Sequence, residues 1–246
     1  AVQLGFVAGT LLSALLNLPD VISSRKLLAI SAFAGAVVNA AFGLFASDFA
    51  TGVVLRFLVG VCLAGVYPPG MKIMATWFRR GRGTALGVLV GALTLGKASP
   101  YLVNAVGSED WRVNVLGASL AAVAGGLVVH LFVGDGPHAL PAARFDVRQV
   151  ARVFSNRGVR LANFGYFGHM WELYAMWTWA PVMIRASGVE PWVTETASFA
   201  MIGAGAIGGV AAGLLADRIG RPIVASAAMA GSGACCLVIG LLFGKA

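Results

Sequence analysis

The chain has 246 residues, of which 59% are hydrophobic and only 11% are charged, and its mean hydropathy is +0.84. A soluble domain cannot bury that much apolar sequence, so the composition excludes a soluble globular protein and indicates a helical membrane protein. The net charge of +8 would suit nucleic-acid binding only if the basic residues gathered on one soluble face, and here they are spread over loops between apolar runs.

Eight apolar segments are long enough to cross a bilayer as helices, which takes about 20 apolar residues. In chain order we predict spans at Val2–Leu18, Leu27–Phe45, Phe49–Met74, Thr84–Val106, Val113–Val133, Leu161–Ile184, Glu195–Ala216 and Ile223–Phe243. The cysteines lie inside these segments without metal-ligand spacing, and we interpret them as small packing residues; they are Cys62, Cys235 and Cys236.

The loops between these spans alternate in charge. One set holds twelve basic residues, namely Arg25, Lys26, Arg79, Arg80, Arg82, Arg144, Arg148, Arg152, Arg157, Arg160, Arg218 and Arg221. The other set, with the C-terminal end, holds only Arg112, Arg185 and Lys245, beside Asp48, Glu109, Asp110 and Glu190. The positive-inside rule therefore predicts that the first set is cytoplasmic and that both ends of this chain lie on the outer side.

One loop, from residue 134 to 160, is longer than the others and divides the chain into three predicted parts. Residues 1–133 hold five spans, residues 134–160 form a cytoplasmic central loop, and residues 161–246 hold three spans. Within the loop, Val147, Val150, Ala151 and Phe154 repeat with helical spacing beside arginines. This pattern predicts an amphipathic helix lying on the cytoplasmic surface of the membrane.

The short loop Gly213–Pro222, with the sequence GLLADRIGRP, combines a carboxylate, two arginines and a glycine turn at Gly220. Asp217 ends one span and lies near the start of the next, whose N-terminus favours negative charge. Arg218 and Arg221 can pair with that carboxylate, with neighbouring loops or with helix-ending carbonyls. We interpret the loop as a latch between two helices at a membrane surface; the alternative is a positive-inside hairpin without a gating role.

A degenerate repeat of this loop follows the first span, where Asp20 precedes Arg25 and Lys26. The copy stands at the same place in the first block of spans as the Asp217 loop does in the second. Such an internal repeat supports a division of the chain into two related halves.

Two basic side chains stand out inside predicted spans, Arg56 and Lys97, because Arg or Lys near the centre costs about 2.5–3.5 kcal/mol. Arg56 cannot lose its charge on burial, so it has either a functional role or a structural one, tied to backbone carbonyls of a neighbouring helix. Lys97 stands near the middle of its span, where it either binds an anion or pairs with an acidic residue elsewhere. Gly83, Gly87 and Gly91 form a stripe at four-residue spacing, which lets another helix approach closely.

Glu172 lies midway along the sixth predicted span and shares one helix face with Tyr166 and His169 at intervals of three residues. It is our candidate for binding and releasing a proton, and the alternative is a neutral carboxylic acid that fixes helix packing. We interpret His169 as a hydrogen-bonding residue of the same cavity.

Four stretches resemble conserved motifs of the major facilitator superfamily. Gly213–Pro222 resembles its signature loop, in which a glycine, an aspartate, a glycine and basic residues follow one another in this order. Arg56 followed by Gly60, a packing position, is similar to the arginine–glycine motif of the family's fourth helix, and this resemblance implies that Arg56 attracts an anion or assists proton transfer. The stretch 77–87 resembles the connection between the fourth and fifth helices, and the stretch 110–112 the external start of the sixth.

The resemblance implies an all-α membrane protein of the superfamily's helical-bundle type, with eight spans out of an expected twelve. The eight spans would be the family's helices two to nine, so that the chain looks like a fragment without helix one and helices ten to twelve. The run Phe164–Pro181, rich in Trp and Tyr, is similar to the bacterial branch of cyanate-, nitrate- and organic-anion-type permeases. These features imply a monomeric, multi-pass protein of the bacterial inner membrane.

A secondary active transporter that works by alternating access is the function that the resemblance implies. A cavity with Arg56 and Lys97 favours proton-coupled transport of a small anionic solute, so the expected partners are that solute, protons and the lipid bilayer, and not nucleic acid. The alternatives are a non-transporting sensor, an inert truncated remnant, or an exporter of hydrophobic cations, which would need an acidic cavity. Since the sequence has no catalytic motif, cofactor motif or metal-ligand cluster, we do not expect an enzyme.

Overall fold

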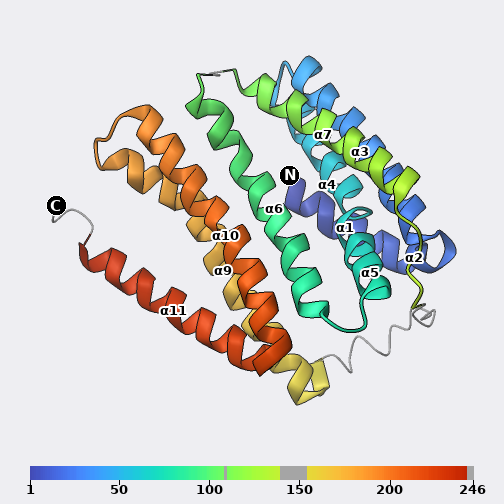
Figure 1. The fold of residues 1–246 in the computed structure, drawn as a ribbon. Coiled ribbons are helices and arrows are strands. Elements are labelled where there is room, and N and C mark those ends of the chain that lie inside the picture. The colour runs from blue at the N-terminus through green and yellow to red at the C-terminus, as the bar shows by residue number, and fades with distance from the viewer. Residues whose placement is uncertain (108–109, 139–153, 243–246) are drawn as a thin grey trace. The chain divides into compact units, whose positions relative to one another are not determined.

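A computed structural model of the chain describes residues 1–107, 110–138 and 154–242, apart from the side chains of Asp20 and Leu242. Every regular element within these ranges is an α-helix, as predicted (Figure 1). The helices are α1 Val2–Leu15, α2 Leu18–Val21, α3 Ser24–Phe45, α4 Phe49–Leu63, α5 Tyr67–Trp77, α6 Arg82–Ala105, α7 Trp111–Phe132, α9 Arg157–Ala186, α10 Pro191–Ile219 and α11 Arg221–Leu242. The predicted amphipathic helix around Val147, Val150 and Ala151 lies outside the described residues.

Six helical segments of the described ranges are long and apolar enough to cross a membrane. They are Ser24–Phe45, Phe49–Trp77, Arg82–Ala105, Trp111–Phe132, Pro191–Ile219 and Arg221–Leu241. The other two predicted spans are also helical. α1 is shorter, with 14 residues, and α9 has 30 residues but carries Arg160, Glu172 and Arg185 along its length.

Side-chain caps begin four of the helices, because the first backbone N–H groups of a helix lack partners within it. Ser23 accepts a hydrogen bond from the backbone of α3, Asp110 from that of α7, and Asn156 from that of α9. Asp48 caps α4 by accepting from Thr51 N at 2.9 Å and Thr51 Oγ1 at 2.6 Å. These two hydrogen bonds, that of the Thr51 side chain first, lower the pKa of Asp48 below its usual 3.8.

The predicted span Phe49–Met74 is not one continuous helix, because α4 ends at Leu63 and α5 begins at Tyr67. Pro68 and Pro69 have no backbone N–H, so neither can donate the hydrogen bond that would continue α4. Gly65 stands in the break, where a Cβ atom would overlap the side chain of Ser31 on α3. The sequence therefore places a break inside an otherwise apolar segment.

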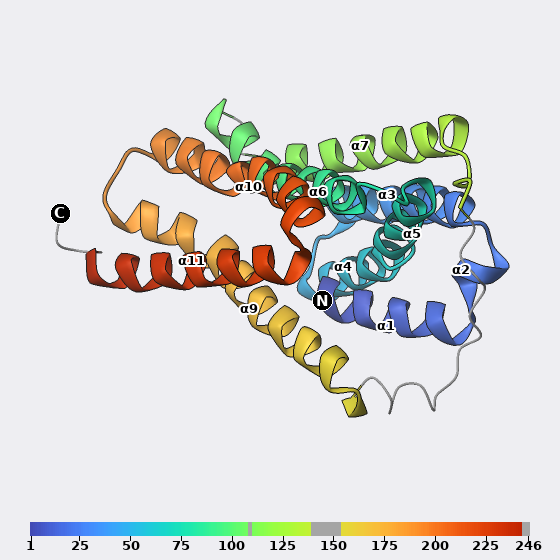
Figure 2. The same cartoon turned by 60° about the horizontal axis from the view of Figure 1, so that its bottom comes forward.

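The described helices form two compact units. The first contains α1 to α5 and α7, with α3 packed against α7 and α4, and α1 packed against α4. The second contains α6 and α9 to α11, and α6 runs alongside α10, as Figure 2 also shows. The predicted division at residues 133 and 160 assigned α6 to the first part, whereas its packing groups it with α10; that division stays a prediction.

Candidate functional site

A polar network in the first unit surrounds Arg56, which is half-buried on α4. Its Nη1 atom donates to Asn39 Oδ1 at 3.0 Å. The amide nitrogen of Asn39, on α3, donates in turn to Val115 O at 2.9 Å and to Ser119 Oγ at 3.0 Å, both on α7. The guanidinium group is thus held by a neutral amide, and no carboxylate within the described ranges pairs with it.

Aromatic rings extend this network along α3 and α7. The Arg56 guanidinium lies 5.0 Å from the ring centroid of Phe42, and the Phe42 ring lies 5.4 Å from that of Trp111. Arg112 stacks on Trp111 at 4.9 Å and donates from Nε to Gly43 O at 3.2 Å. Two cationic groups therefore flank a pair of aromatic rings, an arrangement that stabilises each charge through the ring quadrupole.

A groove of about 370 Å³ opens between α3, α4 and α7 in the same unit. Its walls are small and apolar except at a few side chains, among them Ser31, Asn39 and Ser119. Sequence reasoning singled out Arg56 but missed Asn39, which both lines this groove and holds the arginine. The signal for Asn39 was present, since it is an isolated amide within a long apolar run.

Lys97 lies on α6 in the second unit and is exposed there. Its ammonium group stands 5.8 Å from the ring centroid of Trp177 on α9. The Trp177 ring is buried with Ala98 and Ile202, so it joins α6, α9 and α10 in one apolar cluster. Lys97 therefore stands at the edge of the packed core of this unit.

The predicted polar face of α9 is only partly brought together. His169 Nδ1 lies 3.7 Å from Glu172 Oε2, and their side chains are 46% and 27% exposed. Tyr166 is 56% exposed, one helical turn before His169. On the same helix an open groove of about 460 Å³ is lined by aromatic and small polar side chains, namely Phe167, Met170, Trp171, Tyr174, Ala175, Thr178 and Trp179.

The Asp217 carboxylate accepts hydrogen bonds from the first turn of α6. Its Oδ1 accepts from Gly83 N at 2.9 Å, and its Oδ2 accepts from Thr84 N at 2.8 Å and Thr84 Oγ1 at 2.9 Å. α6 begins without a side-chain cap of its own, so this carboxylate satisfies its free N–H groups and complements the positive end of its dipole. Arg221 lies close enough to interact electrostatically with Asp217, while Arg218 is exposed.

Close packing of small residues brings α6 to this carboxylate. A Cβ atom on Gly83 or Gly87 would overlap the backbone of α10 at Gly213 and Gly209, and one on Gly91 would lie 3.0 Å from Ala206 O. The two helices can therefore approach at this distance only because these positions lack side chains. Gly60 plays the same part in the first unit, where a Cβ atom would overlap the backbone of α1 at Val2.

The earlier copy of the loop makes different contacts. Arg25 donates from Nη1 to Val133 O at 3.4 Å, at the end of α7. The backbone N–H of Lys26 donates to the hydroxyl of Ser23, and its side chain is exposed. The side chain of Asp20 lies outside the described residues. Gly220 ends α10 with φ of 97°, a left-handed conformation that favours glycine.

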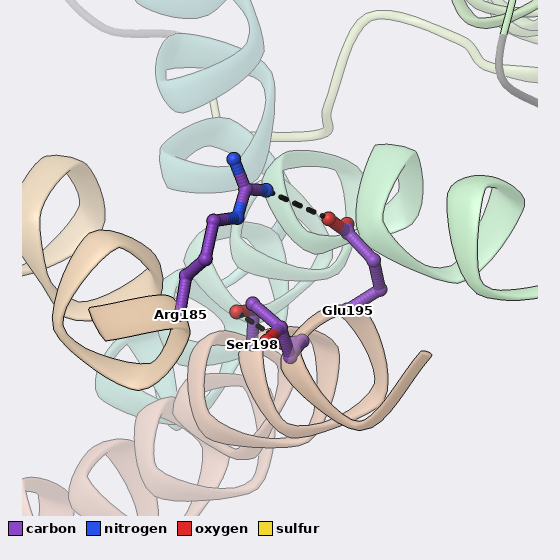
Figure 3. A network of polar contacts seen from close by, with 4 residues as sticks. Arg185, Glu195 and Ser198 are labelled. Carbon is purple, nitrogen blue, oxygen red and sulfur yellow. Dashed lines mark hydrogen bonds and ion pairs between the residues drawn. The ribbon is translucent and has the colours of Figure 1, made fainter. Parts of the chain in front are cut away.

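Sequence reasoning missed a second acidic residue in the membrane segments, Glu195. We predicted a span beginning at Glu195, but α10 begins four residues earlier, at Pro191, so the carboxylate lies within the helix. Arg185, at the end of α9, reaches toward it, and Nη2 lies 3.2 Å from Glu195 Oε1 (Figure 3). Below them the Ser198 hydroxyl donates to Thr194 O at 2.6 Å. Pro191 was the missed signal, because proline is common in the first turn of a helix.

No group of three or more His, Cys, Asp or Glu side chains that could hold a metal ion occurs within the described ranges. The nearest approach to such a site is the His169–Glu172 pair, and two ligands are too few for a structural or catalytic metal. The polar side chains of these helices are thus arranged as cation–amide, cation–π and ion-pair contacts.

Comparison with known proteins assigns the chain to a family. The protein described as "Probable sulfoacetate transporter SauU" from Cupriavidus necator is 26% identical over 222 residues, which cover 81% of this chain and 51% of that protein. The chain thus spans about half the length of this curated relative. No solved structure is significantly similar to this chain. The sequence matches the Major Facilitator Superfamily over residues 1–245, and the chain belongs to that family.

Proposed function

We propose that this chain is part of a secondary active transporter, which moves a small anionic solute together with protons by alternating access. Membership of the superfamily and six helices of membrane-crossing length support the transporter class. The relative's name mentions sulfoacetate, a small molecule with a carboxylate and a sulfonate group, which supports an anionic substrate. The observation that carries the proposal is the tethering of Arg56 by a neutral amide.

Arg56 keeps its positive charge at any physiological pH, and a charged arginine inside a membrane span is costly, at about 2.5–3.5 kcal/mol near the centre. Asn39 fixes the direction of the guanidinium without neutralising it. An arginine that served only to link helices would be better paired with a carboxylate, since charge-assisted pairs are the stronger contacts. A positive group that is held in place but left charged is suited to bind a carboxylate or sulfonate. Lys97 stays a separate candidate for binding an anion.

The contacts of Asp217 support a gating role for its loop. If the predicted division of the chain is right, α6 belongs to the N-terminal half of the transporter and α10 to the C-terminal half. The Asp217 carboxylate would then join the two halves at the end of α10, which the positive-inside rule places at the cytoplasm. Breaking its three hydrogen bonds would be a step in opening that side.

Glu172 is our candidate for the proton that accompanies the anion. It is partly buried on α9, and His169 lies 3.7 Å away, so a proton on either group changes the charge of the pair. A non-transporting sensor, or a truncated remnant, would keep the fold without any flux. An exporter of hydrophobic cations would reverse the preference for anions.

The test uses the complete reading frame reconstituted in liposomes that enclose a pH-sensitive dye. Sulfoacetate, malonate and nitrate, then glucose, then tetraphenylphosphonium are added outside in turn. We expect proton movement with anions alone, lost in Arg56→Gln and kept in part by Arg56→Lys. Glu172→Gln should uncouple protons from the anion, while Glu190→Gln, an exposed carboxylate at the start of α10, should behave as wild type.

Each other outcome contradicts a specific part of the proposal. A response to the cation or to glucose would refute the roles of Arg56 and Lys97. Anion flux without proton movement would refute the role of Glu172. Silence with every compound would favour the sensor or the remnant. Cysteines placed at Arg79 and at Glu190 should be labelled from opposite sides of a bacterial inner membrane, and labelling from the same side would refute the predicted orientation.

A further inference from the structure

The ion pair between Arg185 and Glu195 is unequal in its exposure to solvent. The Glu195 side chain is only 14% exposed, whereas that of Arg185 is 72% exposed. Glu195 Oε1 lies 3.2 Å from Arg185 Nη2, but its Oε2 atom is buried and finds no hydrogen-bond donor among the residues that the structure describes. A largely shielded carboxylate is therefore paired with one exposed cation.

Among the residues that the structure describes, no second cation pairs with Glu195. α6 faces it with Tyr101, which interacts electrostatically with both Glu195 and Arg185, and α6 also carries Lys97, whose ammonium group stands over Trp177. The other charged side chains of α10, Asp217 and Arg218, are both at its C-terminal end, and the single charged residue of α11 is Arg221, near Asp217.

The neighbouring hydroxyls cannot stand in for a cation. Ser198 Oγ already donates to a backbone carbonyl, Thr194 O. Thr194, next to Glu195, is 1% exposed, and its Oγ1 atom lacks a partner in the described part of the chain. Buried polar atoms of native proteins are nearly always paired, so two unpaired oxygens on neighbouring residues leave room for a further partner, such as a proton, a water molecule or a ligand.

Charge balance decides which species can occupy this pair. The Glu195 side chain is only 14% exposed, so its charge is costly without a counter-charge, whereas the charge of Arg185, 72% exposed, is screened by solvent. The ionised pair has a net charge of zero. A proton on Glu195 alone leaves a net charge of +1, and an anion on Arg185 alone leaves −1. A proton and an anion together restore neutrality, so each favours the binding of the other.

We propose that the Arg185–Glu195 pair is a second ligand site. Glu195 takes up a proton there, and Arg185 releases the Glu195 side chain and binds the carboxylate or sulfonate group of a substrate anion instead. The proton comes from solvent and adds to a Glu195 oxygen, and the anion replaces Glu195 as the counter-charge of the guanidinium. This inference rests on the proposed function. It makes Glu195 the alternative to Glu172 as the carboxylate that couples proton and anion, and it places that coupling at the junction of α9 and α10.

Anion binding to the purified full-length protein in detergent tests the exchange without transport. Calorimetric titrations with sulfoacetate, malonate and nitrate are made at pH 5.5, 6.5 and 7.5. We expect the wild-type Kd to fall by up to tenfold for each unit by which the pH falls, because one proton binds with each anion. Glu190→Gln, at an exposed carboxylate just before α10, should keep this dependence.

Three variants separate the exchange from a structural role. In Glu195→Gln we expect a Kd that is independent of pH, since the neutral side chain mimics the protonated acid. Glu195→Asp should restore the pH dependence, and Arg185→Gln should weaken binding at least tenfold at every pH. A melting temperature within a few degrees of wild type shows that the variants are folded, and Glu195→Asp keeps the test valid if Glu195→Gln is not.

The proposal is overturned if Glu195→Gln keeps the wild-type pH dependence, if Glu195→Asp fails to restore it, or if no anion of the series binds. Dependence that is lost in Glu172→Gln and kept in Glu195→Gln places the proton on α9 and also overturns it. Failure of the proposed function is distinct, because it appears as absent flux in liposomes while binding in detergent still follows pH.

Discussion

Removal of the Asn39 amide tests whether the network around Arg56 joins α3, α4 and α7. Asn39→Ala deletes three hydrogen bonds, one to the Arg56 guanidinium and two to α7. The bond from the charged donor contributes about 1.5 kcal/mol, and each neutral bond about 0.6 kcal/mol, the average for helix contacts in a membrane protein. We expect the variant to lose about 2.7 kcal/mol, about a hundredfold in its unfolding equilibrium constant.

A double-mutant cycle isolates the contact between the two side chains. Unfolding in sodium dodecyl sulfate, followed by circular dichroism, gives the free energy for wild type, Asn39→Ala, Arg56→Met and the double variant. We expect a coupling energy of about 1.5 kcal/mol. Ser99→Ala, which removes a hydroxyl bonded only within α6, should be additive with Arg56→Met. A coupling energy below about 0.3 kcal/mol would show that Asn39 does not hold Arg56.

Three further predictions concern packing and caps. Gly87→Ala should destabilise the protein by about 1–3 kcal/mol, because the new methyl group overlaps the backbone of α10. Gly96→Ala, whose methyl group meets open space, should keep the stability of wild type. Equal melting temperatures for the two variants would refute the close approach of α6 and α10. Asp217→Ala should speed hydrogen exchange at the first-turn amides of α6, including that of Thr84, and unchanged protection would refute the cap. Because the pKa of Asp48 is lower in the folded protein than its usual 3.8, the ionised carboxylate stabilises the fold when the pH is above 3.8. This stabilisation is lost as the pH falls through the lowered pKa. Asp48→Ala should therefore be less stable than wild type at neutral pH and equal to it in acid, and a difference that persists in acid would refute the cap's charge.

Hydropathy alone located most of the helices to within a few residues. The predicted span Leu27–Phe45 corresponds to α3 at Ser24–Phe45, and Val113–Val133 to α7 at Trp111–Phe132. This works because a membrane imposes a length and an apolar composition on each helix independently of its neighbours. Hydropathy did not predict the break between α4 and α5, because apolar residues continue across it, although Pro68 and Pro69 indicate it.

Contacts between distant segments were beyond the reach of the sequence. Asp217 stands 134 residues from Gly83, and nothing in either segment names the other as its partner. Glu195 was missed because the start of its helix was placed too late, and a carboxylate at a helix end is an ordinary surface residue. Asn39 was missed because an amide reveals its importance only when its neighbours are known, here Arg56 and Ser119.

The division of one membrane segment into α4 and α5 also has a mechanical consequence. The carbonyl groups of Ala64 and Gly65 have no helical N–H to accept from, because the residues four positions later are Pro68 and Pro69. Hydrogen bonds from Gly65 N to Cys62 O and from Val66 N to Leu63 O, both 3.0 Å, still cross the joint, so rotation there breaks fewer backbone hydrogen bonds than rotation within a continuous helix would. α4, with Arg56, and α5, which is tied through Lys72 to Pro19 O, can tilt as two separate levers within a single crossing of the bilayer.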